Sequence, residues 1–333
     1  MTATIAETYP ELFHYTDIAG LEGILKNQTI WATHAAFLND AREIRLFEER
    51  LPEILKPTIT DGLAKLASIQ ANRSLISLRG GMQKVSEEVT PQIVAGMFNG
   101  LFGNQTTPPF VKAFVTSFCT AATTQIAEHG LLSQWRGYTK NGGYAITFNT
   151  AALYALLTEE AEKWPGHTLI LNDVIYSDDD DKLRLELWQL IEEIKTAITQ
   201  WLQVPPNPQA LENICFPLIQ CACRYKHWGF REENEVRIIS IRPGKELAKM
   251  HSTYAPDTTT KPLSNFIRAG ATVPCIHLFE GISQLPNKPL PITRIIVGPH
   301  QNKDERRRAV ESLLAQYHLG IRVSVSEIPY VSN

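Results

Sequence analysis

The apolar positions of the first fifty residues predict strand, helix, strand and helix in turn. Residues 12–16 and 30–33 carry the apolar, β-branched and aromatic runs typical of short strands. Between them, Asp17 is a typical helix N-cap residue, and the apolar residues after it recur at helical spacing. The charged segment 41–51 predicts a second helix, which we expect Pro52 to end.

The rest of the chain mixes strand and helix patterns without strict alternation. Such a mixture favours an α+β core with helical insertions over a doubly wound parallel sheet. A proline inside the segment 210–225 predicts a kink there. The strand patterns lie at about 110–118, 143–148, 168–176, 235–241, 294–298 and 323–328, and the helical patterns at about 61–99, 150–163, 183–202, 210–225 and 303–317.

Composition and charge indicate an ordinary globular chain. Hydrophobic residues make up 44% of the 333 residues and charged residues 20%, which excludes a disordered or fibrous chain. The net charge of -3 offers no bulk attraction to DNA or to an anionic membrane. No run approaches the roughly 18 apolar residues of a membrane span, and the start resembles no secretory signal. Five sparse cysteines suit a reducing compartment, so we expect a cytoplasmic protein.

The motifs of several common enzyme classes are absent from the sequence. It contains no phosphate-binding P-loop, no Gly-x-Gly-x-x-Gly, no Gly-x-Ser-x-Gly and no His-Glu-x-x-His. Cys221, Cys223 and His227 lie close together, but no second ligand pair follows at zinc spacing. The acidic run 178–181 lacks the glycine and distal glutamate of a calcium loop and is typical of a solvated turn. We therefore expect no metal.

Two polar groups in strand-like segments are candidates for chemistry. Glu233, Glu235 and Arg237 would share one face of a strand, since alternate residues point the same way. The ordinary interpretation is the solvated face of an edge strand, in which Arg237 neutralises an acid; the alternative is a functional cluster. His14 shares a face with Thr16 and is either a packed core histidine or part of the same site.

A third candidate group combines aromatic residues with a cation before a predicted strand. Trp135, Arg136 and Tyr138 precede a glycine turn and Tyr144. Alone, this pattern is typical of a hairpin with surface aromatics. Combined with the other groups, it offers stacking surfaces for a planar ring, a cation for phosphate and a carboxylate for a developing positive charge.

The same motifs, taken in order along the chain, resemble the DUF2971 family. The resemblance implies one domain over residues 1–333, with mainly helical insertions at about 55–108 and 178–226. The matching residues are Leu12-Phe13-His14-Tyr15-Thr16, the helix with Gly20, Leu21, Gly23, Ile24 and Leu25, Ile30-Trp31-Ala32-Thr33, Leu38-Asn39-Asp40-x-x-Glu43, Ser117-Phe118-Cys119, Trp135-Arg136-x-Tyr138, Glu233-x-Glu235-x-Arg237, Ile296-Val297-Gly298-Pro299 and Ile328-Pro329-Tyr330.

The DUF2971 family is in turn similar to the ADP-ribosyltransferase fold, a split mixed or antiparallel sheet. This resemblance implies a site with His14 on the first strand and Glu235 on a later strand, and Glu233 as the first acid of a Glu-x-Glu pair. It places an aromatic residue on a middle strand, and Tyr138, Tyr144 and Trp135 compete for that position. NAD+ would be the cosubstrate.

Each residue type suits one part of that reaction. Glu235 would stabilise an oxocarbenium-like ribose electrostatically, and Glu233 would hydrogen-bond or deprotonate the acceptor. His14 and Thr16 would hold a ribose or the nicotinamide amide. Trp135 or Tyr138 would stack on the nicotinamide ring, and Arg136 would bind the pyrophosphate. Asn39, Asp40 and Glu43 are helix-capping residues or supports for the site.

The expected activity is therefore that of a glycosyltransferase that moves ADP-ribose from NAD+ to a nucleic acid or protein, as a bacterial toxin or phage-defence effector would. The alternatives are an NAD+ glycohydrolase, a nucleotide-binding module without chemistry, and an RNA phosphotransfer enzyme. Basic strips at Arg42, Arg45 and Arg50 and at 306–308 are typical of solvated faces. The sequence leaves the acceptor open, as well as any antitoxin or regulator.

Overall fold

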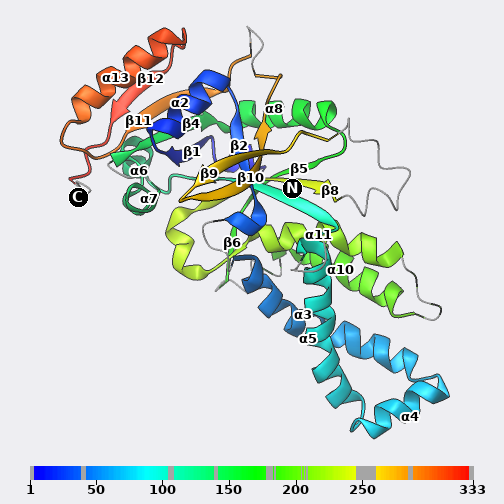
Figure 1. Ribbon diagram of the computed structural model, residues 1–333. Helices are drawn as coiled ribbons and strands as arrows, with labels where there is room; N and C mark the ends of the chain where they lie inside the picture. The colour runs from blue at the N-terminus through cyan, green and yellow to red at the C-terminus, as the bar shows by residue number, and fades with distance from the viewer. Residues whose placement is uncertain are drawn as a thin grey trace.

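A computed structural model gives the fold of the chain (Figure 1). The structure describes residues 4–38, 43–103, 109–138, 142–177, 183, 185–203, 205, 207, 209–244, 260–283 and 288–329. Within these ranges the chain forms a mixed α+β fold around a mostly antiparallel sheet, which confirms the expected class. No helix in these ranges is both long and apolar enough to cross a bilayer.

Ten strands form the main sheet of the described chain, and its pairs are antiparallel except for the last two strands along the sequence. A separate parallel pair joins Ile175–Tyr176 (β6) to Tyr225–Lys226 (β7). The strands of the main sheet are β1 (Glu11–Thr16), β2 (Ile30–His34), β3 (Val111–Cys119), β4 (Tyr144–Asn149), β5 (Thr168–Asp173), β8 (Glu235–Pro243), β9 (Ser264–Arg268), β10 (Ala271–Leu278), β11 (Ile292–Val297) and β12 (Arg322–Val325).

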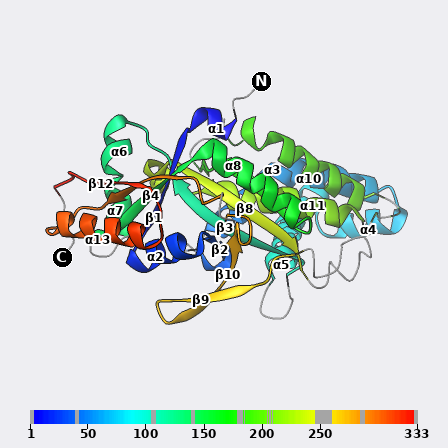
Figure 2. The same ribbon diagram turned by 90° about the horizontal axis from the view of Figure 1, so that it is seen from above.

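Five helices, α3 (Glu43–Leu66), α4 (Gln70–Leu78), α5 (Met82–Phe102), α10 (Trp188–Trp201) and α11 (Gln209–Arg224), lie together on one side of the molecule (Figure 2). The long helices α3, α5, α10 and α11 share one hydrophobic core with β3 and β8, and a second core lies between the sheet and α2, α8 and α13. The helices are α1 (Ile5–Thr8), α2 (Ile18–Asn27), α3 (Glu43–Leu66), α4 (Gln70–Leu78), α5 (Met82–Phe102), α6 (Thr124–His129), α7 (Leu132–Gly137), α8 (Thr150–Lys163), α10 (Trp188–Trp201), α11 (Gln209–Arg224) and α13 (Lys303–Gln316), with 3-10 turns η1 (Ala35–Phe37) and η3 (Trp228–Glu233).

The first charged helix is longer than its prolines predicted. Pro52 was expected to end it, but α3 runs through Pro52 and Pro57 to Leu66. A proline in a helix interior costs about 3 kcal/mol. Phe47, Leu51, Leu55 and Ile59 form a fully buried stripe on α3, and their burial outweighs that cost.

The expected helix over 61–99 is instead divided among three helices, the end of α3, α4 and α5. α4 and α5 are separated by Gly80 and Gly81, whose φ angles of 93° and 95° are incompatible with a right-handed helix. The predicted helix over 150–163 agrees with α8 at both ends, where the Asn149 side chain caps the first turn by accepting from the Ala152 amide.

Two strands, β1 and β2, pair with different parts of the same edge of β3. The opposite edge of β3 pairs with β8 along the whole of β8, from Val111 opposite Pro243 to Cys119 opposite Glu235. On the edge that β1 and β2 share, β2 pairs at Val115 and Phe114, whereas β1 pairs at Cys119.

Between the β1 and β2 pairing positions on β3, side chains replace the backbone hydrogen bonds of the sheet. There the Thr116 hydroxyl donates to the Trp31 carbonyl at 2.8 Å, and the His14 ring bonds the Ser117 carbonyl at 3.0 Å. The strands β1 and β2 therefore part over the middle of β3, and this parting positions the site described next.

Candidate functional site

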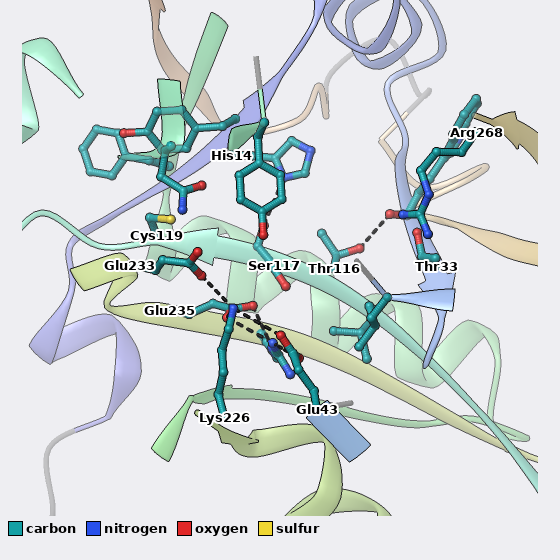
Figure 3. Close-up of a pocket in the computed structure, with 18 residues that line it drawn as sticks. His14, Thr33, Glu43, Thr116, Ser117, Cys119, Lys226, Glu233, Glu235 and Arg268 are labelled. Atoms are coloured by element: carbon teal, nitrogen blue, oxygen red, sulfur yellow. Dashed lines mark hydrogen bonds and ion pairs between the residues drawn. The ribbon is translucent and has the colours of Figure 1, made fainter. Parts of the chain in front are cut away.

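A cavity of about 180 Å³ lies where β1 and β2 part (Figure 3). His14 from β1 and Glu235 from β8 both line it, although they are 221 positions apart in the sequence, as the difference of their numbers shows. Glu43, Glu233 and Arg268 also contribute to its wall. The fold thus brings together the imidazole and the acid that the sequence singled out.

Five charged side chains form one ion-pair network along the floor of the cavity. Glu235 accepts from Arg237 Nε at 2.7 Å and from Lys226 Nζ at 2.8 Å. Arg237 also donates to Glu43 at 2.6 Å, and Lys226 donates to Glu233 at 2.7 Å. When all five are ionised, three carboxylates face two cations, and one negative charge remains at the floor.

The edge-strand interpretation of this segment was wrong. β8 lies between β3 and β5, and Glu235 and Arg237 are only 3% and 2% exposed. Because an unpaired buried charge is very costly, the two groups are tolerable only as parts of the network. Glu233 is not on the strand but in η3, and it reaches the network from there.

A sharp backbone turn brings both glutamates to the cavity. Asn234 lies between them in the left-handed region, with φ of 44°, a conformation that asparagine adopts more readily than most residues. Its carbonyl accepts from the Thr120 amide at 3.0 Å and hydroxyl at 3.1 Å. The Tyr176 hydroxyl accepts from the Glu235 amide at 3.0 Å. These bonds fix the start of β8 beside the end of β3.

The environment moves the pKa values of the two glutamates in opposite directions. Burial raises the pKa of Glu233, and the attraction of Lys226 only partly offsets that rise. Burial acts on Glu235 in the same direction, but Arg237 and Lys226 together outweigh it and hold the pKa of Glu235 at about 2. Two carboxyls with separated pKa values suit a division of roles, with Glu235 as a permanent anion and Glu233 as the proton carrier.

His14 presents a neutral ring to the cavity. Burial lowers the pKa of His14, and the bond to the Ser117 carbonyl only partly opposes that shift. A carbonyl oxygen can only accept, so Nδ1 carries the proton and donates to Ser117 at 3.0 Å. Nε2 is then a hydrogen-bond acceptor. His14 is therefore suited to bind a hydroxyl or an amide N–H of a ligand.

The structure separates the three competing aromatic residues. Tyr138 is 41% exposed and lines the cavity. Trp135 is fully buried: its ring packs edge-on against Tyr15 at 4.8 Å, and its Nε1 donates to the His129 carbonyl at 3.0 Å. Tyr144 is 5% exposed in β4, outside the lining of this cavity. Of the three, only Tyr138 lines this cavity, whereas Trp135 is packed in the interior.

A second cavity of about 470 Å³ adjoins the first. The two share His14, Trp31 and Arg268, and Thr16 lines the second cavity only. Arg136 is exposed on α7 and lines neither cavity. The cation at the junction is instead Arg268 on β9, whose guanidinium donates to the Phe37 carbonyl. Arg136 therefore lies away from both cavities, whereas Arg268 lies where they join.

The sequence motifs singled out one further network residue, Glu43, and missed another, Lys226. Glu43 belonged to a polar cluster expected to cap a helix or support the site; in the structure it lies in the first turn of α3 and pairs with Arg237 and Lys226. Its companions Asn39 and Asp40 lie outside the described residues. Lys226 was not singled out in the sequence. The feature that could have indicated it is a single lysine within the aromatic-rich segment from Tyr225 to Phe230.

The described residues contain no group of three or more His, Cys, Asp or Glu side chains placed to hold a metal. The three network glutamates are instead bridged by Lys226 and Arg237. Burial raises the pKa of both Cys221 and Cys223 to about 12, so both thiols stay protonated. The acidic run 178–181 and Tyr330 lie outside the described residues.

Residues 134–238 match the model of a protein family described as a protein of unknown function, DUF2971. This segment belongs to the DUF2971 family. No match was found among curated proteins or among solved structures. The DUF2971 segment contains Lys226, Glu233, Glu235 and Arg237, and thus most of the ion-pair network. His14, Glu43 and Arg268 reach the cavity from outside the matched segment.

Proposed function

We propose that the protein is an ADP-ribosyltransferase, which cleaves NAD+ between nicotinamide and ribose and transfers ADP-ribose to a nucleic acid or protein. The observation that carries the proposal is the charge arrangement along the two joined cavities. Excess negative charge lies at the floor around Glu235, neutral His14 lies above it, and Arg268 lies at the junction. NAD+ has the complementary order, a cationic ring at one end and a pyrophosphate in the middle.

The proposed binding mode assigns one part of NAD+ to each cavity. The nicotinamide and its ribose occupy the 180 Å³ cavity, with Tyr138 against the ring and His14 Nε2 accepting from a hydroxyl or the amide. Arg268 pairs with the pyrophosphate. The adenosine half enters the 470 Å³ cavity beside Thr16 and Trp31. The parting of β1 and β2 over β3 supports a split sheet like that of ADP-ribosyltransferases.

The proposed reaction gives each glutamate one role. The bond from ribose C1′ to the ring nitrogen breaks, its electron pair stays on nicotinamide, and nicotinamide leaves neutral. Glu235 stabilises the remaining oxocarbenium-like cation by its charge, since its oxygens are already held by Arg237 and Lys226. An acceptor oxygen or nitrogen attacks C1′, and Glu233 takes the acceptor's proton.

One observation favours a second candidate, a module that binds NAD+ without chemistry. Both carboxylate oxygens of Glu235 are already paired, Oε1 with Arg237 and Oε2 with Lys226 and Arg237. A ribose hydroxyl would therefore have to displace a cation before it could bond to Glu235.

Incubation with adenine-labelled NAD+ and a mixture of DNA, RNA and protein separates these functions. The proposed transferase releases nicotinamide and leaves label on a macromolecule. Label found only in free ADP-ribose would instead identify a glycohydrolase. Saturable NAD+ binding without nicotinamide release would identify the binding module, and the absence of binding would reject both proposals.

The raised pKa of Glu233 predicts a pH dependence of the transfer step. Glu233 accepts a proton only when ionised, so transfer should increase as pH rises through a pKa above the ordinary value of 4.5. Single-turnover transfer measured from pH 4 to pH 8, about the range in which such a carboxyl titrates, tests this. Glu233→Gln should remove the rise, whereas nicotinamide release into water should keep a weaker pH dependence.

A further inference from the structure

Three exposed aromatic side chains lie on α7 and η3, the two elements that bring Tyr138 and Glu233 to the cavity. Trp228 is 57% exposed and Phe230 is 37% exposed, both on η3, and Tyr138 at the end of α7 is 41% exposed. The two elements are in contact with each other. The proposed binding mode uses Tyr138 for nicotinamide, so we call Trp228 and Phe230 the aromatic shelf. Exposed large aromatics gathered beside a cavity are typical of binding surfaces.

The backbone under the aromatic shelf is fixed by local hydrogen bonds. The Ser177 hydroxyl accepts from the Trp228 amide at 3.1 Å, and the His227 ring accepts from the Gly229 amide at 3.1 Å. The ring of Phe230 lies 4.8 Å from Lys226 Nζ, the cation that holds both Glu233 and Glu235. The shelf is therefore coupled to the network at a defined position beside the proton carrier.

Cations border the aromatic shelf on both elements. Arg231 is exposed on η3 and Arg136 is exposed on the last turn of α7. Flat aromatic faces that stack on bases, bordered by arginines that meet phosphates, are the combination that binds single-stranded nucleic acid. Glu232 is also exposed on η3 and offsets part of this charge, but a polypeptide acceptor would gain from the aromatics alone.

We infer that the aromatic shelf binds single-stranded nucleic acid and presents one of its bases or phosphate-backbone groups to Glu233 as the acceptor. The acceptor role rests on the proposed ADP-ribosyltransferase activity, whereas the binding itself does not. Stacking tolerates any base, so the shelf selects for unpaired strands rather than for a sequence. Duplexes keep their bases stacked on one another and offer no free face to Trp228.

Binding of a fluorescent 12-nucleotide single strand, measured by anisotropy without NAD+, tests the inference separately from catalysis. DNA and RNA versions form two arms, and a duplex of the same sequence forms a third. Trp228→Ala should weaken single-strand binding about 5-fold to 100-fold, as expected for the loss of one stacked base. Trp188→Ala is the matched control, because Trp188 is similarly exposed, at 56%, but lies on α10 rather than on η3 or α7.

The salt dependence gives a second readout. Arg231→Gln should reduce the slope of log affinity against log salt by about 0.7, the contribution of one phosphate contact in a single strand. Equal losses in Trp228→Ala and Trp188→Ala, or absent binding by the wild-type protein, would overturn the inference. So would equal affinity for the duplex. Displacement of the strand by an unfolded polypeptide that itself needs Trp228 would assign the shelf to a protein acceptor instead.

Discussion

Replacing Glu235 with Gln should lower nicotinamide release from NAD+ by about 100-fold to 1000-fold, the effect of removing one preorganised electrostatic group. The substitution keeps the shape of the side chain but removes the permanent anion from the cavity floor. NAD+ affinity should change much less, because His14, Tyr138 and Arg268 are retained. Nicotinamide release under saturating NAD+ measures the effect.

Glu43→Gln is the matched control for this prediction. Glu43 belongs to the same network and is 6% exposed, against 3% for Glu235. It pairs with Arg237 at 2.6 Å, so its loss also disturbs the network, but it has no proposed contact with ribose. Glu43→Gln should therefore reduce the rate far less than Glu235→Gln. Equal rates in the two variants would remove Glu235 from its proposed role.

Replacing Arg237 with Met should lower the free energy of unfolding by about 3–5 kcal/mol, the usual effect of leaving buried partner charges unpaired. Arg237 is 2% exposed and bonds Glu235, Glu43 and the Cys223 carbonyl. Two buried carboxylates would then depend on Lys226 alone. Urea unfolding at pH 7 measures the change.

The dependence of the free energy of unfolding on pH, below about pH 4.5, provides a further check on the Arg237 variant. The pKa of Glu235 is held at about 2, below its ordinary value of 4.5, so its ionised form stabilises the fold above about pH 4.5. That stabilisation is lost as pH falls toward 2, and it should be smaller in Arg237→Met. Arg308→Met changes an exposed arginine, 69% accessible on α13, and should alter unfolding by less than about 0.5 kcal/mol. Similar losses in both variants would contradict the account of the network.

The sequence predicted a helix or strand well where a local feature, such as an N-cap residue or an alternation of apolar positions, marks it. The helix capped by Asn149 and the strand from Val111 were found because alternation and capping are local properties. Helix α3 was predicted too short, because the burial that carries it through Pro52 comes from other helices. Long-range packing of that kind leaves no periodic signal near the proline.

The candidate site was predictable in its parts but not in its assembly. His14, Glu233 and Glu235 were singled out by residue type and by the resemblance to the DUF2971 family, and they meet at one cavity. Lys226 was missed because a lone lysine in a sequence is usually exposed, and Arg268 because only tertiary pairing of β9 brings it to the junction.

The most direct test of the central claim is a crystal structure of the protein with a non-hydrolysable NAD+ analogue bound. The account predicts the nicotinamide ribose between His14 and Glu235, with the pyrophosphate against Arg268 and the adenosine beside Thr16. A dinucleotide bound at another surface, or one whose phosphates face the Glu235 floor, would contradict it.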